Sequence, residues 1–157
     1  MNPYKILIVD DEENILWVLK KGLEKNNYIV DTATSGEKAL EQLQKNKYLM
    51  MFSDIFMEGI SGLELMEQSL RICPELKIVM MTAQDSMNNT IEAMRLGAYD
   101  YLSKPFDFDD VYKLLAKAEA ADWRGVTIQT AQVELFVSSF IHLTSLRIHL
   151  TRFRPKF

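Results

Sequence analysis

The sequence predicts an α/β fold, a three-layer, doubly wound sandwich with a parallel sheet between two layers of helices. Short apolar segments of strand length alternate five times with segments whose apolar residues recur at helical spacing. The strand-like segments are rich in apolar residues, and two of them, residues 6–9 and 49–52, are wholly apolar, as is typical of parallel strands that are buried on both faces. The helical segments between them supply the crossovers that parallel strands need. The order of the strands does not follow from this pattern.

The first strand is predicted over residues 6–9 and the second over residues 28–33. The helix between them is predicted to face the sheet with residues at i, i+3, i+4, i+7 and i+8, namely Ile15, Val18, Leu19, Gly22 and Leu23. Ser35 is a suitable N-cap for the next helix. The inner face of that helix is predicted to carry Ala39, Leu40 and Leu43.

The third and fourth strands are predicted over residues 49–52 and 76–81. Between them, a loop from Gly59 to Gly62 leads into a helix that ends before Pro74. This helix is predicted to face the sheet with Leu63, Met66 and Leu70.

A short fifth strand is predicted over residues 98–103. The helix before it is predicted to end at Gly97 as a C-cap residue and to bury Met87, Ile91 and Met94. A final helix is predicted to begin after Asp107 as N-cap and to bury Val111, Leu114, Leu115 and Ala118. The methionines in these segments are interpreted as core filler.

Composition and charge exclude several classes of protein. Apolar residues make up 48% of the chain and charged residues 25%, which excludes a chain that is disordered as a whole. The net charge of −4 gives no overall attraction to nucleic acid or to an anionic membrane, so we expect this chain to bind neither. The lone Cys73 can form neither an internal disulfide nor a cysteine-ligated zinc site. Because no apolar stretch suits a signal peptide or a membrane span, the sequence predicts a cytoplasmic protein.

The charge balance changes after Ala121. Residues 1–121 hold 13 Lys and Arg against 20 Asp and Glu, a net charge of −7, whereas residues 122–157 hold 5 against 2, a net charge of +3. We therefore expect one α/β domain over 1–121 and a C-terminal extension of unknown role over 122–157.

Three roles are open to the extension: an output or homodimer-forming strand, a nucleic-acid contact, or an adventitious addition without function. The nucleic-acid contact would use its basic residues Arg147, Arg152, Arg154 and Lys156. His142 and His149 are assigned no role, because their spacing places them on one face only in a helix, whereas the local pattern favours a strand.

Polar residues interrupt the apolar pattern at the carboxyl ends of the predicted strands. Asp10 and Asp11 follow the first strand, Asp54 the third, Thr82 the fourth and Lys104 the fifth. In open parallel sheets, this edge is where ligands bind. Each residue alone is an ordinary helix-terminal or turn residue, but their occurrence in this order on successive units predicts one site.

The residue types at this edge indicate phosphoryl chemistry with a divalent metal. Three carboxylates in one place repel one another unless a cation neutralises them, and Mg²⁺ suits a site with few carboxylates. A Thr hydroxyl and a Lys ammonium are suited to the other oxygens of a phosphoryl group. Asp54, at the end of a rigid buried strand, is the candidate nucleophile and would form an aspartyl phosphate.

A family resemblance rests on four segments, which are Val9-Asp10-Asp11-Glu12, Asp54 with Met57 and the Gly59 to Gly62 loop, Met81-Thr82-Ala83-Gln84, and Gly97-Ala98-Tyr99-Asp100-Tyr101-Leu102-Ser103-Lys104-Pro105-Phe106-Asp107. They resemble the receiver domain of bacterial two-component response regulators. The last two segments are most similar to receivers of the NtrC-type, sigma-54-dependent transcription activators. The resemblance implies a phosphoprotein in two-component signal transduction that is linked to transcription regulation, with a sensor histidine kinase as its partner.

The resemblance further implies a flavodoxin-like sheet of order 2-1-3-4-5 and a set of metal ligands. Asp54 would be the phosphoacceptor. Asp11 and Asp54 would bind Mg²⁺ directly, Asp10 would act mostly through water, and the main-chain carbonyl of Phe56 would complete the protein ligands.

The resemblance also implies how phosphorylation changes the surface. Thr82 and Lys104 would hold the phosphoryl oxygens, and Thr82 would shift toward them while Tyr101 turns inward. The surface of the fourth helix, fifth strand and fifth helix would change as a result. The Lys104–Pro105 bond would be cis.

Two features depart from the family pattern. Glu58 stands where the family usually has proline, which adds flexibility and a negative charge beside Asp54. NtrC-type activators continue into ATPase and DNA-binding domains, whereas this chain holds no Gly-x-x-x-x-Gly-Lys-Ser/Thr phosphate loop. We therefore expect either a stand-alone receiver or a truncated regulator whose extension replaces the output domains.

Two other functions are considered for the same residues. A magnesium-dependent phosphatase of the haloacid-dehalogenase-like class also uses an Asp nucleophile, but it needs an acid two residues later, where this chain has Phe56. A flavin-binding module needs a phosphate-binding loop after the first strand, where this chain has four consecutive acids. We expect a phosphoacceptor that promotes only its own phosphorylation and dephosphorylation, and not an enzyme.

Overall fold

The structure, a computed structural model, describes residues 4–83 and 87–122. The chain divides into two compact units, Met1–Ala118 and Glu119–Phe157, and the first contains the whole sheet. The extension predicted over residues 122–157 lies outside the described residues beyond Asp122, and so does Gln84 of the family motif.

Five parallel strands form one sheet in the order β2-β1-β3-β4-β5, which confirms the predicted fold class. The strands are β1 (Lys5–Val9), β2 (Ile29–Ala33), β3 (Met50–Asp54), β4 (Lys77–Ala83) and β5 (Asp100–Lys104). The helices are α1 (Glu13–Lys25), α2 (Gly36–Lys45), α3 (Gly62–Ile72) and α4 (Met87–Leu96), and residues 108–122 are helical as well. Each strand lies within two residues of its predicted bounds.

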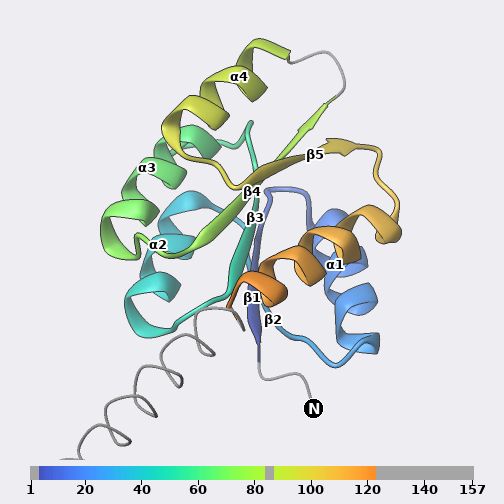
Figure 1. The fold of residues 1–157 in the computed structure, drawn as a ribbon. Helices are drawn as coiled ribbons and strands as arrows, with labels where there is room; N and C mark the ends of the chain where they lie inside the picture. Colours follow the sequence, from blue (N-terminus) through green and yellow to red (C-terminus); the bar gives the residue numbers. More distant parts are fainter. Residues whose placement is uncertain (1–3, 84–86, 123–157) are drawn as a thin grey trace, which may run out of the picture. The chain divides into compact units, whose positions relative to one another are not determined.

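Helices cover both faces of the sheet, with α2, α3 and α4 on one face and α1 and the helical residues 108–118 on the other (Figure 1). Because side chains alternate along each strand, the sheet feeds two cores. Leu7 and Ile78 pack on the α2 side, and Ile6 and Phe52 pack on the α1 side. Five methionines are completely buried in these cores, as predicted, namely Met50, Met51, Met66, Met80 and Met81.

Two predicted helix faces are partly wrong. In α1 the buried residues are Leu16, Leu19 and Leu23, whereas Val18 is 45% exposed. In α4 the buried residue is Ala93, whereas Ile91 and Met94 are 48% and 46% exposed, and the Met87 side chain lies outside the described part of the chain. Both helices carry apolar residues on more than one flank, so that the packing against the sheet selects which stripe is buried.

The predicted helix ends are correct, and their caps explain them. The Ser35 side chain accepts a hydrogen bond from the Lys38 N–H at 3.3 Å, which caps α2. Gly97 ends α4 with a φ of 106°, in the left-handed region that glycine tolerates, and the Ala98 N–H donates to the Ala93 carbonyl at 3.0 Å. The last helix begins directly after Asp107, as predicted.

Helix α1 and the last helix approach closely at Gly22. A Cβ at this position would collide with the ring of Phe108, so that only glycine fits. The Tyr112 hydroxyl donates to the Gly22 carbonyl at 3.0 Å and accepts from Asn26 Nδ2 at 2.7 Å. This contact fixes the segment that follows β5.

Among the described residues, no helix is long and apolar enough to cross a membrane.

Candidate functional site

The carboxyl edge of the sheet gathers the polar residues that interrupt the apolar pattern. Asp54 is the last residue of β3, Thr82 lies in β4, Lys104 ends β5, and Asp10 and Asp11 follow β1. Asp10, Asp54 and Thr82 are buried although they are polar, whereas Asp11 is exposed. Buried polar groups persist in folded proteins where they are paired or bind a ligand, so this edge is the candidate site.

Asp10 holds the turn from β1 into α1. Its Oδ1 accepts a hydrogen bond from the Glu12 N–H at 2.9 Å, and its Oδ2 accepts one from Lys104 Nζ at 2.8 Å. Asp11, which is exposed, lies in the sequence between Asp10 and Glu12, the two residues that this first hydrogen bond joins. The two adjacent acids therefore have different surroundings, one enclosed and one facing solvent.

Lys104 bridges two carboxylates. Its Nζ lies 3.1 Å from Asp54 Oδ1 in addition to its contact with Asp10. The ammonium is itself mostly buried, and a buried pair of this kind needs close geometry to offset the loss of hydration. Lys104 thus joins the ends of β1, β3 and β5.

Burial raises the pKa of Asp54, and the charge of Asp10 adds to this effect. The Lys104 ammonium acts in the opposite direction without cancelling the rise. For Lys104, burial lowers the pKa, but the two carboxylates outweigh burial and the net direction is upward. The lysine therefore stays charged at neutral pH, while Asp54 is a more basic carboxylate than an ordinary aspartate.

The acids at this edge fit a small divalent cation. One ligand oxygen from each of Asp10, Asp11 and Asp54 can be chosen so that all three lie within 4.8 Å of one another. Carboxylate oxygens in this number suit Mg²⁺, which completes its shell with water, carbonyl or phosphate oxygens. The residues present therefore fit the metal predicted from the sequence.

A family model described as the response regulator receiver domain matches residues 6–116. The chain belongs to this family. The family match confirms the resemblance drawn from the sequence motifs. The observed strand order β2-β1-β3-β4-β5 confirms the order that the resemblance implies.

The relatives of this receiver include NtrC-type regulators, as predicted. The DNA-binding transcriptional regulator NtrC of Escherichia coli K12 is 35% identical over 113 residues, which cover 72% of this chain and 24% of NtrC. The chain thus spans about a quarter of the length of this curated relative.

Two solved receivers are similar in structure. The receiver domain of NtrX from Brucella abortus has a TM-score of 0.69 and 30% identity, covering 72% of this chain and 96% of NtrX's. The response regulator protein TrrA of Thermotoga maritima, in complex with Mg²⁺-BeF, has a TM-score of 0.67 and 35% identity, covering 73% and 98% of the two chains. The alternative of a haloacid-dehalogenase-like phosphatase finds no support in these comparisons.

The structure also describes the remaining predicted site residues, Thr82, Phe56 and Tyr101. The Thr82 hydroxyl donates to the Ala83 carbonyl at 3.2 Å. Phe56 and Tyr101 are 59% and 49% exposed, so that Tyr101 has its ring at the surface. The bond between Lys104 and the next proline is cis, as the resemblance implies.

Sequence reasoning missed the residues that hold the loop after Asp54. Gly62 packs against the main-chain oxygen of Asp54, where a Cβ would have no room. Ser61 and Glu64 form a capping box at the start of α3, and their Ser-x-x-Glu spacing is a sequence signal that would have predicted it. Glu37 contacts the same loop from α2 and carries no local signal.

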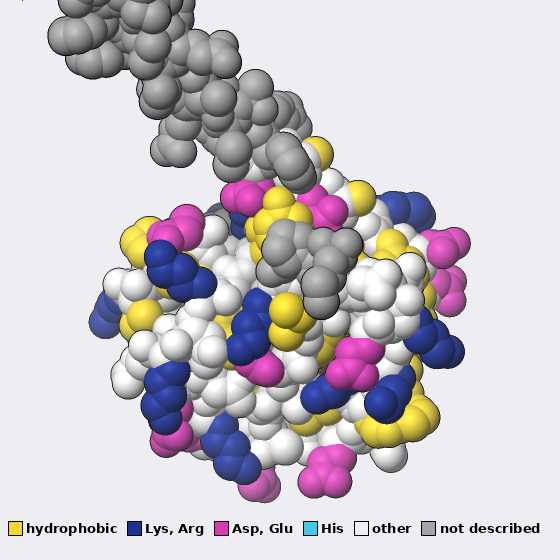
Figure 2. Space-filling model, turned by 90° about the horizontal axis from the view of Figure 1, so that it is seen from below, with side chains coloured by type: hydrophobic (Ala, Val, Ile, Leu, Met, Phe, Trp, Pro, Cys, Tyr) yellow, Lys and Arg dark blue, Asp and Glu magenta, His cyan; other side chains and the backbone are white. Residues whose placement is uncertain are grey.

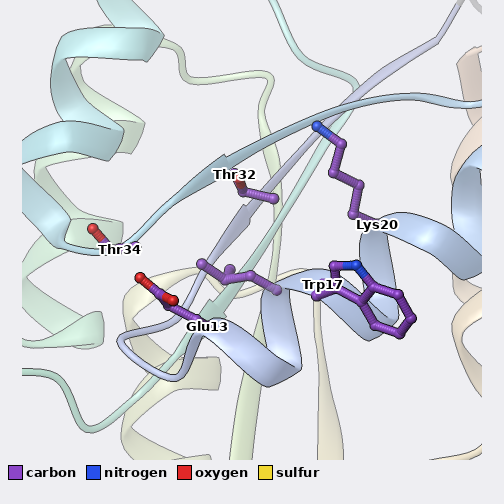
Figure 3. Close-up of a pocket in the computed structure, with 6 residues that line it drawn as sticks. Glu13, Trp17, Lys20, Thr32 and Thr34 are labelled. Carbon is purple, nitrogen blue, oxygen red and sulfur yellow. The ribbon is translucent and has the colours of Figure 1, made fainter.

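Two other surface features lie apart from these residues. A cavity of about 260 Å³ lies between α1 and the end of β2 and is lined by Glu13, Leu16, Trp17, Lys20, Thr32 and Thr34 (Figure 3). It contains none of the predicted site residues.

On the face seen in Figure 2, basic and acidic side chains are interspersed, without one large block of either sign.

Proposed function

We propose that this receiver accepts a phosphoryl group on Asp54, with Mg²⁺ as cofactor, in a two-component signalling pathway. The observation that carries the proposal is the buried Asp54 carboxylate at the end of β3, 3.1 Å from the Lys104 ammonium and clustered with Asp10 and Asp11. A carboxylate that is fixed by a rigid strand and beside a permanent cation is suited to in-line attack on phosphorus.

The proposed donor is a phosphohistidine of a sensor histidine kinase. A carboxylate oxygen of Asp54 attacks the phosphorus, a P–O bond forms, the P–N bond breaks, and the imidazole leaves. Lys104 stays charged and stabilises the negative phosphoryl oxygens, with the Thr82 hydroxyl on the neighbouring strand as a further donor. Asp11, Asp54 and the Phe56 carbonyl would hold Mg²⁺ directly and Asp10 mostly through water, and the metal would supply charge neutralisation at the phosphoryl oxygens.

We further propose that the phosphoryl group is stored and not turned over on a separate substrate. The residue two positions after Asp54 is Phe56, whose exposed ring offers neither a proton donor nor a base. Hydrolysis then depends on unassisted water, and the aspartyl phosphate persists long enough to act as a signal.

We propose that the switch changes the surface of α4, β5 and the helix that follows β5, and exposed apolar residues on α4 and β5 support this. Ile91, Met94 and Leu96 of α4 and Tyr101 of β5 are exposed apolar or aromatic residues. Exposed apolar groups of this kind suit a surface whose contacts change with state. The predicted link to transcription regulation rests on the NtrC-type relatives, and residues 1–121 remain the proposed receiver domain.

The test is incubation of the whole chain with a small phosphodonor, such as acetyl phosphate, and Mg²⁺. Intact-mass spectrometry should show the gain of one phosphoryl group that is stable in acid and labile in base. Asp54→Ala should show no gain, and equal labelling of this variant would contradict the proposal.

A further inference from the structure

The loop that joins β3 to α3 is fixed at its two ends by main-chain contacts. The Ile55 N–H donates to the Met81 carbonyl at 3.1 Å, and the Gly62 N–H donates to the Ile55 carbonyl at 2.9 Å. The close approach of Gly62 to the Asp54 carbonyl adds to this closure. Residues 56–60 therefore form a bulge between two fixed ends, and these contacts do not hold the residues of the bulge itself.

The tip of this bulge lies against the first turn of α2. Glu37 Oε1 accepts a hydrogen bond from the Ile60 N–H at 3.3 Å. A Cβ on Gly36 would meet the Cβ of Ile60 at 3.0 Å, so the backbone of α2 approaches the loop as closely as a glycine allows. The two elements are thus in contact through a hydrogen bond and through packing.

Gly59 makes room for the Glu37 carboxylate. Its φ is 77°, in the left-handed region, and a Cβ there would lie 2.7 Å from Glu37 Oε1. The loop therefore takes a conformation that only glycine adopts easily, in the place where the carboxylate meets it. Such a conformation persists where neighbouring groups hold it.

The Glu37 side chain is itself held in an accepting state. The pKa of Glu37 is lowered mainly by its own backbone N–H and by the Ser35 side chain, with burial acting in the opposite direction and the Ile60 N–H adding a smaller lowering effect. The carboxylate is thus ionised at neutral pH and cannot donate a proton to the loop. It therefore acts as an acceptor, and the loop group that pairs with it is the Ile60 N–H.

We propose that Glu37 is a positioning residue of the phosphorylation site, which acts on the metal through the β3–α3 loop. By holding the Ile60 N–H, it fixes the bulge that carries the Phe56 main-chain carbonyl next to Asp54, and so increases the affinity of the site for Mg²⁺. Glu58, in the same bulge, lacks the fixed φ that a proline would impose, so the contact with α2 supplies a restraint that residue 58 does not. The inference rests on the proposed function, because it assigns the loop carbonyl to the metal.

The test measures Mg²⁺ affinity directly and does not depend on phosphorylation. The chain labelled with ¹⁵N is titrated with Mg²⁺ alone, and amide shifts around Asp11 and Asp54 give the dissociation constant for the parent, Glu37→Ala, Glu37→Gln and Glu41→Ala. Glu41 is an exposed residue one turn further along α2 and serves as the matched control.

Glu37→Ala should weaken Mg²⁺ binding about three- to tenfold, the range expected from loss of one hydrogen bond. Glu37→Gln keeps an acceptor oxygen and should bind within about twofold of the parent. Glu41→Ala should match the parent, and all measurements are made at a temperature at which each variant is fully folded.

Parent-like affinity of Glu37→Ala, or an equal loss in Glu41→Ala, would overturn the positioning role while leaving the proposed function intact. A parent chain that shows no Mg²⁺-dependent shifts near Asp54 would overturn the proposed metal site and this inference together. The two failures are therefore distinguishable in one titration.

Discussion

The Lys104 ammonium lies 3.1 Å from Asp54 Oδ1 and joins the carboxyl ends of two strands that are not neighbours in the sheet, β3 and β5. It reaches across the end of β4 to do so. The lysine thus forms ion pairs with both the proposed nucleophile and Asp10. The bridge lowers the pKa of Asp54, but burial raises it by more.

Asp54→Asn should increase the free energy of unfolding at pH 7.5 by on the order of 1 kcal/mol. Burial raises the pKa of Asp54 above 3.8, so the folded state binds its proton more tightly than the unfolded chain does. Stability is therefore lost as pH rises from 3.8 through the raised value, and the full penalty is present above it. The variant removes this penalty, while Lys104 keeps Asp10 as a partner.

Urea unfolding of Asp54→Asn and the parent checks this prediction. The difference between them should be largest at pH 7.5 and should shrink as the pH is lowered toward 4. The exposed Asp11→Asn serves as the control and should change stability little at either pH. A variant that is less stable than the parent at pH 7.5 would show that the Lys104 contact outweighs burial.

Asp11→Ala should raise the Mg²⁺ concentration that is needed for half-maximal phosphorylation by about tenfold or more. Asp11 is exposed and belongs to the acidic cluster, so its removal takes away a proposed metal ligand without opening the core. Phosphorylation by a small phosphodonor across a Mg²⁺ series measures the effect, and thermal unfolding should stay close to that of the parent. An unchanged Mg²⁺ requirement would place the metal elsewhere.

Phe56→Asn should shorten the lifetime of the phosphorylated state by about tenfold, because an amide can orient the attacking water that the Phe56 ring leaves unassisted. Phe56 is 59% exposed, so the change should leave the fold intact. Decay of the phosphorylated protein after removal of the donor measures the rate. Glu58→Gln, in the same loop, is the control, and equal decay of Phe56→Asn and the parent would count against this account.

Residues 1–121 alone should fold cooperatively and accept a phosphoryl group, because they contain all five strands, their covering helices and every proposed site residue. Chemical denaturation followed by tryptophan fluorescence tests folding, since Trp17 lies on α1. Phosphodonor labelling tests the site. Failure of this segment to fold would move the domain boundary into residues 122–157.

Much of the fold and the edge of the sheet could be predicted from local sequence. Asp54 and Lys104 follow short segments of strand length, and a polar residue at the end of a buried strand has to lie at the edge of the sheet. The buried faces of α1 and α4 could not be predicted fully, because Val18 and Ile91 are apolar at helical spacing and yet lie beside the packed stripe. The contact between Glu37 and Ile60 joins residues 23 positions apart and depends on tertiary structure alone.

Phosphorylation of Asp54 itself is checked by locating the modified residue in the chain. The chain is phosphorylated with acetyl phosphate and Mg²⁺, reduced with borohydride so that an aspartyl phosphate becomes homoserine, digested and sequenced by mass spectrometry. The account predicts homoserine at residue 54 in the parent and none when Mg²⁺ is omitted. Homoserine at Asp10 or Asp11 with an unmodified Asp54 would contradict it.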